Sequence, residues 1–444
     1  MFDVAPKFSK KLLIKSLWAT TLLLMAAMSE VAAFQEDLDI IEKLNQYRGK
    51  VVDLTTGKSL IFATISVENT NISTITNTEG EFLLKVPESL SNSTVIVSFL
   101  GYKTRSIALS QLKPRNNSIG LSVAVTQLSE VNVDIPKNPT ALVREVLRKR
   151  GENYIDDPTL MTAFYRETIK KRRRNVSLSE AVVNIYKSPY NSKGKDIVQL
   201  YKARKSTDYS KLDTVALKLQ GGPFNTLYVD IMKYPEYIFD KSFLPFYKFT
   251  FDRSTKINDR AIYVIKFRQL ESIDEPLYQG ELFIDVVNKT LTSAIYTLNI
   301  TNKQKAARLF VRRKPPKVDV WPTQIAYRID YREKGGKWYY GYSNVLLEFK
   351  VDWQDKLFNS VYSMTAEMAV TDWKTNVSGE IPKNNERIKS SIILTDEAIG
   401  FSDPNFWGEY NIIEPEKSIE SAIKKIQRQL KRARRNGTAS LPIP

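Results

Sequence analysis

The sequence contains no histidine and no cysteine in 444 residues. Without histidine, the usual general base, the imidazole metal ligand and the Ser-His-Asp triad are all excluded. Without cysteine, there are no thiol nucleophiles, disulfides, Cys-type zinc sites or lipid-bearing cysteine. An enzyme would have to rely on Asp/Glu pairs, Ser-Lys, Tyr or oxygen-ligated metals. We therefore predict no catalytic, cofactor-binding or metal-binding residue and no cofactor, although whether the chain is an enzyme stays open.

The composition is that of a folded, basic protein. Hydrophobic residues make up 42% and aromatic residues 11% of the chain, enough for sizeable cores in two or three domains. Lysine and arginine number 66 against 49 aspartate and glutamate, a net charge of +17. Such a field favours anionic partners such as phosphates, acidic sugars or lipid headgroups. A solubilising basic surface spread over the chain is the plainer interpretation.

Residues 1–33 have the pattern of a secretory signal peptide. Four lysines between positions 7 and 15 precede the apolar stretch "LWATTLLLMAAM" at 17–28, which is too short to span a bilayer comfortably. The small residues of "VAA" at 31–33 then predict cleavage before Phe34. An uncleaved membrane anchor is the alternative. No later window reaches 18 apolar residues, so we expect an exported mature chain with no transmembrane span, located in the periplasm or at the outer membrane.

Residues 47–124 alternate between apolar and polar side chains with a period of two. Seven short runs rich in Val, Ile, Thr and Phe are separated by turn residues, including Gly80 and Gly101, where a positive φ is easily adopted. Strands at this spacing predict a seven-stranded antiparallel sandwich. The runs are 47–53, 61–69, 72–77, 81–86, 94–100, 103–109 and 118–123.

The stretch "GKVVDLTTGKSLIFATISVENTNISTITNTEGEFLLKVP", followed by "VIVSFLGYKT", resembles the carboxypeptidase-regulatory-like domain. That resemblance implies a transthyretin-like sandwich, common in envelope proteins of the Bacteroidetes. With the later "FWGEYNIIEP", the chain resembles a two-domain family of such proteins, which implies an architecture and a compartment and no particular activity. In peptidases carrying this sandwich, the chemistry lies in a separate zinc domain with histidine ligands. Zinc carboxypeptidase activity is therefore excluded here.

A linker and helix are expected over 125–155. The segment "TQLSEVNVD", 126–134, resembles the connection between such sandwiches and TonB-dependent receptors. In "NPTALVREVLRKRG", 138–151, Asn138 is a suitable N-cap, Pro139 fits the first turn and Gly151 fits the C-terminal stop. The basic cluster at 148–150 is explained by the negative end of the helix dipole.

Residues 156–412 predict a large curved antiparallel meander or half-barrel. The order "AIYVIKF", "YQGELFIDVVNKTLTSAIYTLNI" resembles lipoprotein-carrier-like periplasmic proteins. An amphipathic basic helix is expected over 413–435, with apolar residues at helical spacing. The fold class is thus mainly β with a short helix between the two parts and a C-terminal helix. The extended runs are 161–170, 178–186, 197–205, 246–253, 261–269, 278–288, 291–300, 307–313, 323–332, 337–353 and 361–373.

Three groups of residues are candidates for function. The basic runs Lys170–Asn175 and Lys431–Arg435 fit a solvated hairpin tip and a docked helix end, or contacts to acidic glycans or headgroups. Glu271, Asp274 and Glu275 cluster in a stretch that Pro276 marks as a loop, with no sign of glycosidase geometry. Several aromatic residues fit either a sugar platform or, more ordinarily, the core: Tyr339, Tyr340, Tyr342, Trp353, Trp373 and Trp407.

The leading hypothesis is a non-catalytic exported envelope protein that binds or scaffolds at the periplasm or outer membrane. Its partner would be an anionic glycan, a lipid or an outer-membrane protein complex, and no nucleic acid is expected for an exported chain. One alternative is a carboxylate-dependent hydrolase of envelope polysaccharide. Another is an accessory partner of a TonB-dependent receptor.

Overall fold

The structure is a computed structural model that describes residues 43–123, 138–172, 174–207, 219–252, 255–257, 260–311, 314–354, 359–400 and 406–416. The chain forms two compact units, Met1–Asn45 with Val86–Ser91 and Gln46–Lys85 with Asn92–Pro444. In the smaller unit, Glu88 N donates to Lys43 O at 2.8 Å and the two side chains form an exposed ion pair. The larger unit carries the long sheet described below.

Seven strands form a sandwich, as predicted, in two sheets of order β4-β1-β7 and β3-β2-β5-β6. Alternation explains the inner face: in β5, Val95 and Val97 are buried while their neighbours are half-exposed. Gly80 and Gly101 have the expected positive φ, 78° and 85°. One pairing differs from the antiparallel expectation, because β1 and β7 run parallel. The strands are β1 Leu44–Asp53, β2 Thr64–Val67, β3 Ser73–Ile75, β4 Glu81–Pro87, β5 Thr94–Ser98, β6 Arg105–Ala108 and β7 Asn117–Leu121.

The predicted connecting helix is confirmed as α2, Pro139–Arg148. The Asn138 side chain accepts a hydrogen bond from Ala141 N at 3.0 Å, which is the predicted N-cap. The predicted stop at Gly151 is wrong: α2 ends at Arg148, and Gly151 lies inside a second short helix, α3 Arg150–Asn153. Residues three and four apart bring Leu142, Val143 and Val146 onto the buried face of α2.

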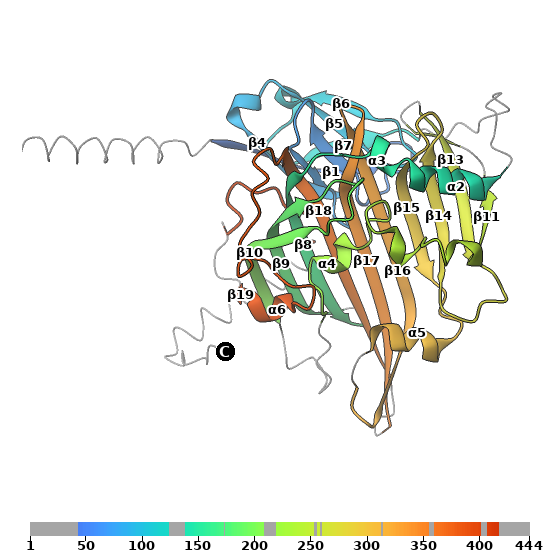
Figure 1. Ribbon diagram of the computed structural model, residues 1–444. Helices are drawn as coiled ribbons and strands as arrows, with labels where there is room; N and C mark the ends of the chain where they lie inside the picture. Colours follow the sequence, from blue (N-terminus) through green and yellow to red (C-terminus); the bar gives the residue numbers. More distant parts are fainter. Residues whose placement is uncertain are drawn as a thin grey trace, which may run out of the picture. The chain divides into compact units, whose positions relative to one another are not determined.

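A twelve-stranded sheet occupies most of the remaining chain, confirming the predicted meander. It is open and curved, and its path runs β11-β13-β14-β15-β16-β17-β18-β8-β9-β10-β19, with β12 beside β13 (Figure 1). The β10–β19 pairing is parallel and the other registers in this sheet are antiparallel. The strands are β8 Thr159–Lys171, β9 Arg174–Lys187, β10 Ile197–Thr207, β11 Tyr247–Phe251, β12 Thr255–Ile257, β13 Arg260–Gln269, β14 Tyr278–Asp285, β15 Thr290–Leu298, β16 Val318–Lys334, β17 Lys337–Trp353, β18 Ser360–Thr375 and β19 Ile399–Gly400.

One of the predicted extended runs is wrong. Residues 307–313 were expected as a strand, but Lys303–Phe310 form helix α5. The Asn302 side chain caps this helix by accepting from Lys305 N at 3.1 Å, and Ala306 is the buried residue of the helix. Further short helices described in the large unit are α4 Phe224–Leu227, α6 Leu394–Glu397, and the 3-10 turns η2 Leu109–Gln111, η4 Pro235–Tyr237 and η5 Leu244–Phe246.

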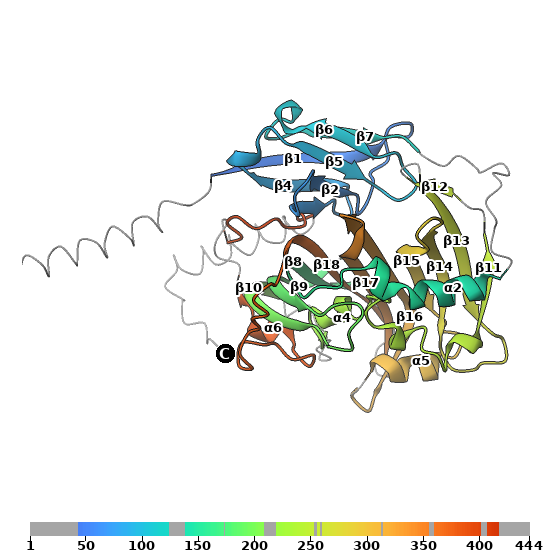
Figure 2. The ribbon, with the colours of Figure 1, turned by 45° about the horizontal axis from the view of Figure 1, so that its top comes forward.

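The largest core lies on one face of the curved sheet. Figure 2 shows α2 and α4 lying over this face, and the core joins Val143 of α2 to Leu227 of α4 and to strand residues such as Met368. Within the described residues, no helix has both the length and the apolar character needed to cross a bilayer. The predicted signal segment 1–33, the segment 126–134 and most of the predicted helix 413–435 lie outside the described residues. The described start of that last segment, 413–416, is not helical.

Candidate ligand-binding cavity

A cavity of about 550 Å³ lies on the α4-covered face of the large sheet. Its floor follows one cross-strand row, in which Tyr296 of β15, Tyr327 of β16, Val345 of β17 and Ala366 of β18 are direct neighbours. Because side chains alternate between faces along each strand, Val345, Leu347 and Phe349 of β17 all reach the cavity. The floor is therefore built from one apolar face of four adjacent strands.

Tyr278, together with Tyr296 and Tyr327 at the end of the floor row, forms one wall of the cavity. The rings of Tyr296 and Tyr327 are stacked at 5.0 Å, and Tyr278 stands edge-on to both at 5.6 and 5.8 Å. Gly280 lies opposite Tyr296, and a Cβ on this glycine would come within 2.5 Å of Tyr296 Cα. Burial raises the pKa of all three phenols, so their hydroxyls stay neutral. This wall is aromatic and uncharged.

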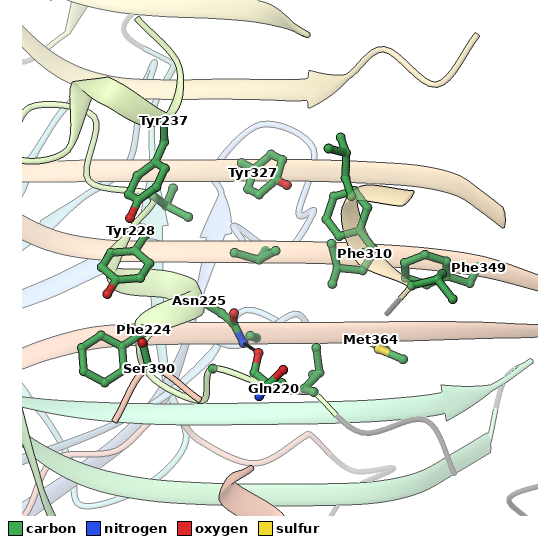
Figure 3. Close-up of a pocket in the computed structure, with 18 of the residues that line it drawn as sticks. Gln220, Phe224, Asn225, Tyr228, Tyr237, Phe310, Tyr327, Phe349, Met364 and Ser390 are labelled. Atoms are coloured by element: carbon green, nitrogen blue, oxygen red, sulfur yellow. Dashed lines mark hydrogen bonds between the residues drawn. The ribbon is translucent and has the colours of Figure 1, made fainter. Parts of the chain in front are cut away.

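The roof is the segment 219–239, here called the α4 segment. Gly221 and Gly222, with φ of 118° and 50°, turn the chain into α4, and a Cβ on Gly221 would come within 2.4 Å of the Asn225 side chain. Tyr228 packs against Phe224 at 5.6 Å and against Tyr237 at 5.2 Å. Figure 3 shows these rings at one end of the cavity, with Phe310, Phe349 and Met364 at the other.

A buried polar cluster fastens the α4 segment to the sheet. The Asp230 carboxylate accepts hydrogen bonds from Lys187 Nζ at 2.7 Å and from the hydroxyls of Tyr190 and Tyr331, both at 2.9 Å. Lys187 also pairs with Asp196 at 2.8 Å. Burial alone would lower the pKa of Lys187, but the two carboxylates outweigh it and raise that pKa. Because Asp230 is satisfied on both oxygens, the roof is held in place without a ligand.

The floor row continues beyond the cavity to a buried acid. Glu167 of β8 is the direct neighbour of Ala366 and is 3% exposed. Its carboxyl accepts a hydrogen bond from the Tyr165 hydroxyl at 3.0 Å. Burial raises the pKa of Glu167 to about 7, and the Tyr165 hydrogen bond opposes this only in part. This acid is accordingly uncharged over much of the acidic pH range.

The rim of the cavity contains polar side chains and is open to solvent. Leu309 is 58% and Tyr237 is 48% exposed, so both line the cavity and face water. Asn225 Nδ2 donates to Gln220 O at 3.1 Å at the α4 end. Among the described lining residues, Lys314 carries the one formal charge. The remaining lining residues are Gly221, Phe224, Tyr228, Val229, Ile238, Tyr278, Tyr296, Phe310, Val311, Val320, Tyr327, Val345, Leu347, Phe349, Met364, Ala366, Leu219 and Ser390.

The acidic candidates from the sequence lie in an exposed loop beside a smaller cavity of about 330 Å³. Lys305 Nζ binds Asp274 at 3.0 Å and Glu275 at 2.5 Å, and Glu271 pairs with Arg268 at 3.4 Å. The hydrogen bond from Lys305 lowers the pKa of Asp274, whereas a general acid needs a raised one. All three carboxylates form surface ion pairs, and none of them lines the cavity under the α4 segment.

One of the two basic candidates falls within the described residues. Lys170–Asn175 forms the predicted hairpin tip between β8 and β9, with Arg172 and Arg174 exposed and Lys170 Nζ 3.7 Å from Glu416. Lys431–Arg435 lies outside the described residues. None of the described basic tip residues lines the cavity.

The aromatic candidates serve as packing residues. Tyr339, Tyr340, Tyr342, Trp353 and Trp407 are all buried, and Trp373 is half-buried. Tyr339 packs against Trp373 at 5.0 Å. These six residues do not line the cavity, so the plainer interpretation as core residues is confirmed for the buried five.

The residues that form the cavity were not singled out from the sequence. The strand alternation places Tyr327, Leu347 and Met364 on one face, a signal that was present in the sequence. It does not tell whether that face is filled by other side chains or left open. The glycine pair at 221–222, before Pro223, was the local sign of a chain reversal leading into a roof.

Comparison with known proteins supports the sandwich. Residues 47–133 match the family described as CarboxypepD_reg-like domain. This match agrees with the resemblance found at 47–124 and extends it by several residues. Among curated proteins, none matches the chain.

Several solved structures are similar in part. An outer membrane lipoprotein-sorting protein domain from Vibrio parahaemolyticus is 9% identical, with 56% of this chain and 94% of that chain covered and a TM-score of 0.25. A LolA superfamily protein from Nitrosomonas europaea is 11% identical, covering 56% and 98%, with a TM-score of 0.23. A membrane-associated protein from Bacteroides fragilis is 10% identical, covering 74% and 98%, with a TM-score of 0.14. Likenesses this distant say nothing about the activity of this chain.

Proposed function

We propose that this protein binds the acyl chain of a lipid or of a lipid-modified molecule in the cavity beneath the α4 segment. It does so as an exported, non-catalytic protein of the cell envelope. The observation that carries the proposal is the cavity of about 550 Å³, which is lined mostly by aliphatic and aromatic side chains with a few polar groups.

The size and lining suit a flexible apolar ligand. Ligand cavities fall in the range of roughly 300–1,000 Å³ and are mostly apolar with a few polar groups. Each methylene transferred from water into such a cavity contributes about 0.8 kcal/mol before the cost of association. An apolar cavity also holds water poorly, so a chain entering it displaces little that is well bound.

The fixed roof favours binding rather than simple core packing. Asp230 holds the α4 segment by accepting three hydrogen bonds of 2.7–2.9 Å, from Lys187, Tyr190 and Tyr331, independent of any occupant. A cavity that is already formed spares the ligand the cost of ordering its site. A core meant only for stability would close over the same space, because unfilled volume is destabilising.

The location and the non-catalytic role rest on the sequence. The signal-like segment 1–33 and the regulatory-like sandwich support export to the envelope. The acids of the exposed 271–275 loop are engaged with lysine and arginine, which supports binding over the hydrolase alternative. The segment that suggested a TonB-dependent receptor, 126–134, lies outside the described residues, so that partner stays a hypothesis.

The test is binding of palmitic acid carrying a fluorophore, measured by fluorescence on wild type and two matched variants. Leu347→Trp fills the cavity, because Leu347 lines it from β17. Leu346→Trp makes the same change at the neighbouring, equally half-buried position, which points to the opposite face. We expect Leu347→Trp to weaken binding at least tenfold and Leu346→Trp to leave it within twofold.

Three outcomes would contradict the proposal. Wild type that fails to bind the probe would favour a scaffold role. Equal loss in both variants would place binding outside the cavity. Stronger binding of oligosaccharides than of palmitic acid would assign the tyrosine wall to sugar stacking instead. Thermal unfolding of each variant shows that it is folded before binding is compared.

A further inference from the structure

Lys314 stands out in the lining because it is the one charged side chain among the described residues there. It lies between α5 and β16, at the end of the cavity formed by Phe310 and Phe349, whose rings are 6.0 Å apart. The Lys314 side chain is 41% exposed, so the stem can lie along the apolar lining while the ammonium stays at the solvent-facing edge. The charge and the apolar lining together describe an amphiphile.

The hydrogen bonds of Lys314 leave room for one more acceptor. Its Nζ donates to Val318 O at 2.5 Å and to Asp319 Oδ1 at 3.0 Å. An ammonium has three donors. Its side chain is 41% exposed and that of Asp319 is 62% exposed, so their ion pair is a weak one that a bound anion can share or replace.

The two ends of the cavity differ in charge. At the α4 end, the polar lining groups are Gln220, Asn225 and Ser390, which carry no formal charge. At the α5 end, Leu309 is 58% exposed next to Phe310 and Lys314. A ligand with a long apolar tail and a negative head therefore complements the cavity in one orientation, with its head near Lys314 at the α5 end.

We propose that the ligand is an amphiphile with an anionic head, a carboxylate or a phosphate, held by Lys314 at the α5 end of the cavity. Its acyl chain runs from there along the strands toward Tyr228. Asp319 acts against this contact, since its carboxylate competes for the same ammonium. The inference rests on the proposed acyl-chain binding, because it assigns the head group and orientation of that same ligand.

The experiment compares three ligands with the same palmitoyl chain: palmitic acid, palmitoyl lysophosphatidic acid and the neutral palmitamide. Each competes with the fluorescent palmitic acid probe at about pH 8, where the carboxylate is ionised. We expect both anionic ligands to bind wild type about fivefold more tightly than palmitamide, the upper range for an exposed ion pair. The preference between the two anionic ligands identifies the head, carboxylate or phosphate.

Substituting the two members of the ion pair should change the preference for anionic ligands in opposite directions. Lys314→Gln should remove the preference for anionic ligands, so that palmitic acid, palmitoyl lysophosphatidic acid and palmitamide bind this variant with similar affinity. Asp319→Asn should increase the preference by a similar factor, because it frees the ammonium. Lys317→Gln is the matched control: Lys317 is exposed in the same connection but does not line the cavity. Raising the salt concentration should reduce the preference in wild type and not in Lys314→Gln.

The outcomes separate this inference from the proposed function. If all three ligands bind wild type equally, acyl-chain binding stands and the role of Lys314 is wrong. If Lys317→Gln lowers the preference as much as Lys314→Gln does, a diffuse basic surface replaces the specific contact and overturns the inference. If no ligand binds wild type, the proposed acyl-chain binding itself is wrong.

Discussion

Glu167 gives the sharpest test of how the large sheet is packed. Glu167 lies on the face of the sheet that the α4 segment covers, and the residue is 3% exposed. The Tyr165 hydroxyl is 3.0 Å from its carboxyl. Burial disfavours the charged carboxylate, so the pKa of Glu167 rises from 4.5 to about 7 in the folded protein. Replacing it with glutamine keeps the shape of the protonated acid and removes the ionisation.

The size of the stability change follows from the pKa of Glu167 in the unfolded and in the folded protein. Because the folded pKa lies above the unfolded one, the stabilising contribution is complete below about pH 4.5 and is lost as the pH rises to about 7. At 1.36 kcal/mol per pKa unit, the loss is about 3 kcal/mol. Glu167→Gln should therefore gain about 3 kcal/mol in unfolding free energy relative to wild type between about pH 4.5 and pH 8.

Urea unfolding followed by tryptophan fluorescence measures this difference at both pH values. Other buried acids affect wild type and variant alike, so subtracting one curve from the other isolates Glu167. The matched control is Glu380→Gln, an exposed loop position where we expect less than about 0.5 kcal/mol of change at either pH. A difference between Glu167→Gln and wild type that is the same at both pH values would refute the burial of this acid.

Three further predictions concern stability. Asp230→Asn should cost about 1–3 kcal/mol in urea unfolding and weaken probe binding, because it removes one of the two carboxylates that pair with the buried Lys187 ammonium; full retention of both would show that the roof is held otherwise. Gly280→Ala should cost about 1–3 kcal/mol, since its Cβ would meet Ile295 O at 2.2 Å, and an unchanged melting temperature would contradict the register. Asn138→Ala should cost about 1 kcal/mol by removing the cap bond to Ala141 N, measured by thermal unfolding, whereas Asn138→Ser should retain most of it.

Local patterns in the sequence were sufficient for most of the strands. In β17, Lys337–Trp353, the alternation of apolar and polar residues predicted the strand, and from Phe349 to Trp353 the apolar residues at every second position are the more buried ones. The turn at Gly335 and Gly336 was also predictable, because both adopt a positive φ that other residues avoid. The cap of α2 was predicted from Asn138 and Pro139 for the same kind of reason: the required interactions are within a few residues.

Helix α5 shows where short-range patterns fail. The letters "ARLFVRR" alternate well enough for a strand, yet Lys303–Phe310 are helical. The deciding groups are the cap at Asn302 and the burial of Ala306 against the sheet, and the second of these depends on residues far along the chain. A run of eight residues is too short for its own periodicity to decide.

The sequence by itself determined which chemistries are absent, the alternation of the strands and the regulatory-like sandwich, because each of these is a property of residue types or of near neighbours. Only the tertiary structure decided that Tyr296, Tyr327, Val345 and Ala366 form one row, that a segment pinned by Asp230 covers it, and that the space between stays open. Periodicity tells which face a side chain occupies, whereas the volume left unfilled on that face depends on how distant segments pack against it.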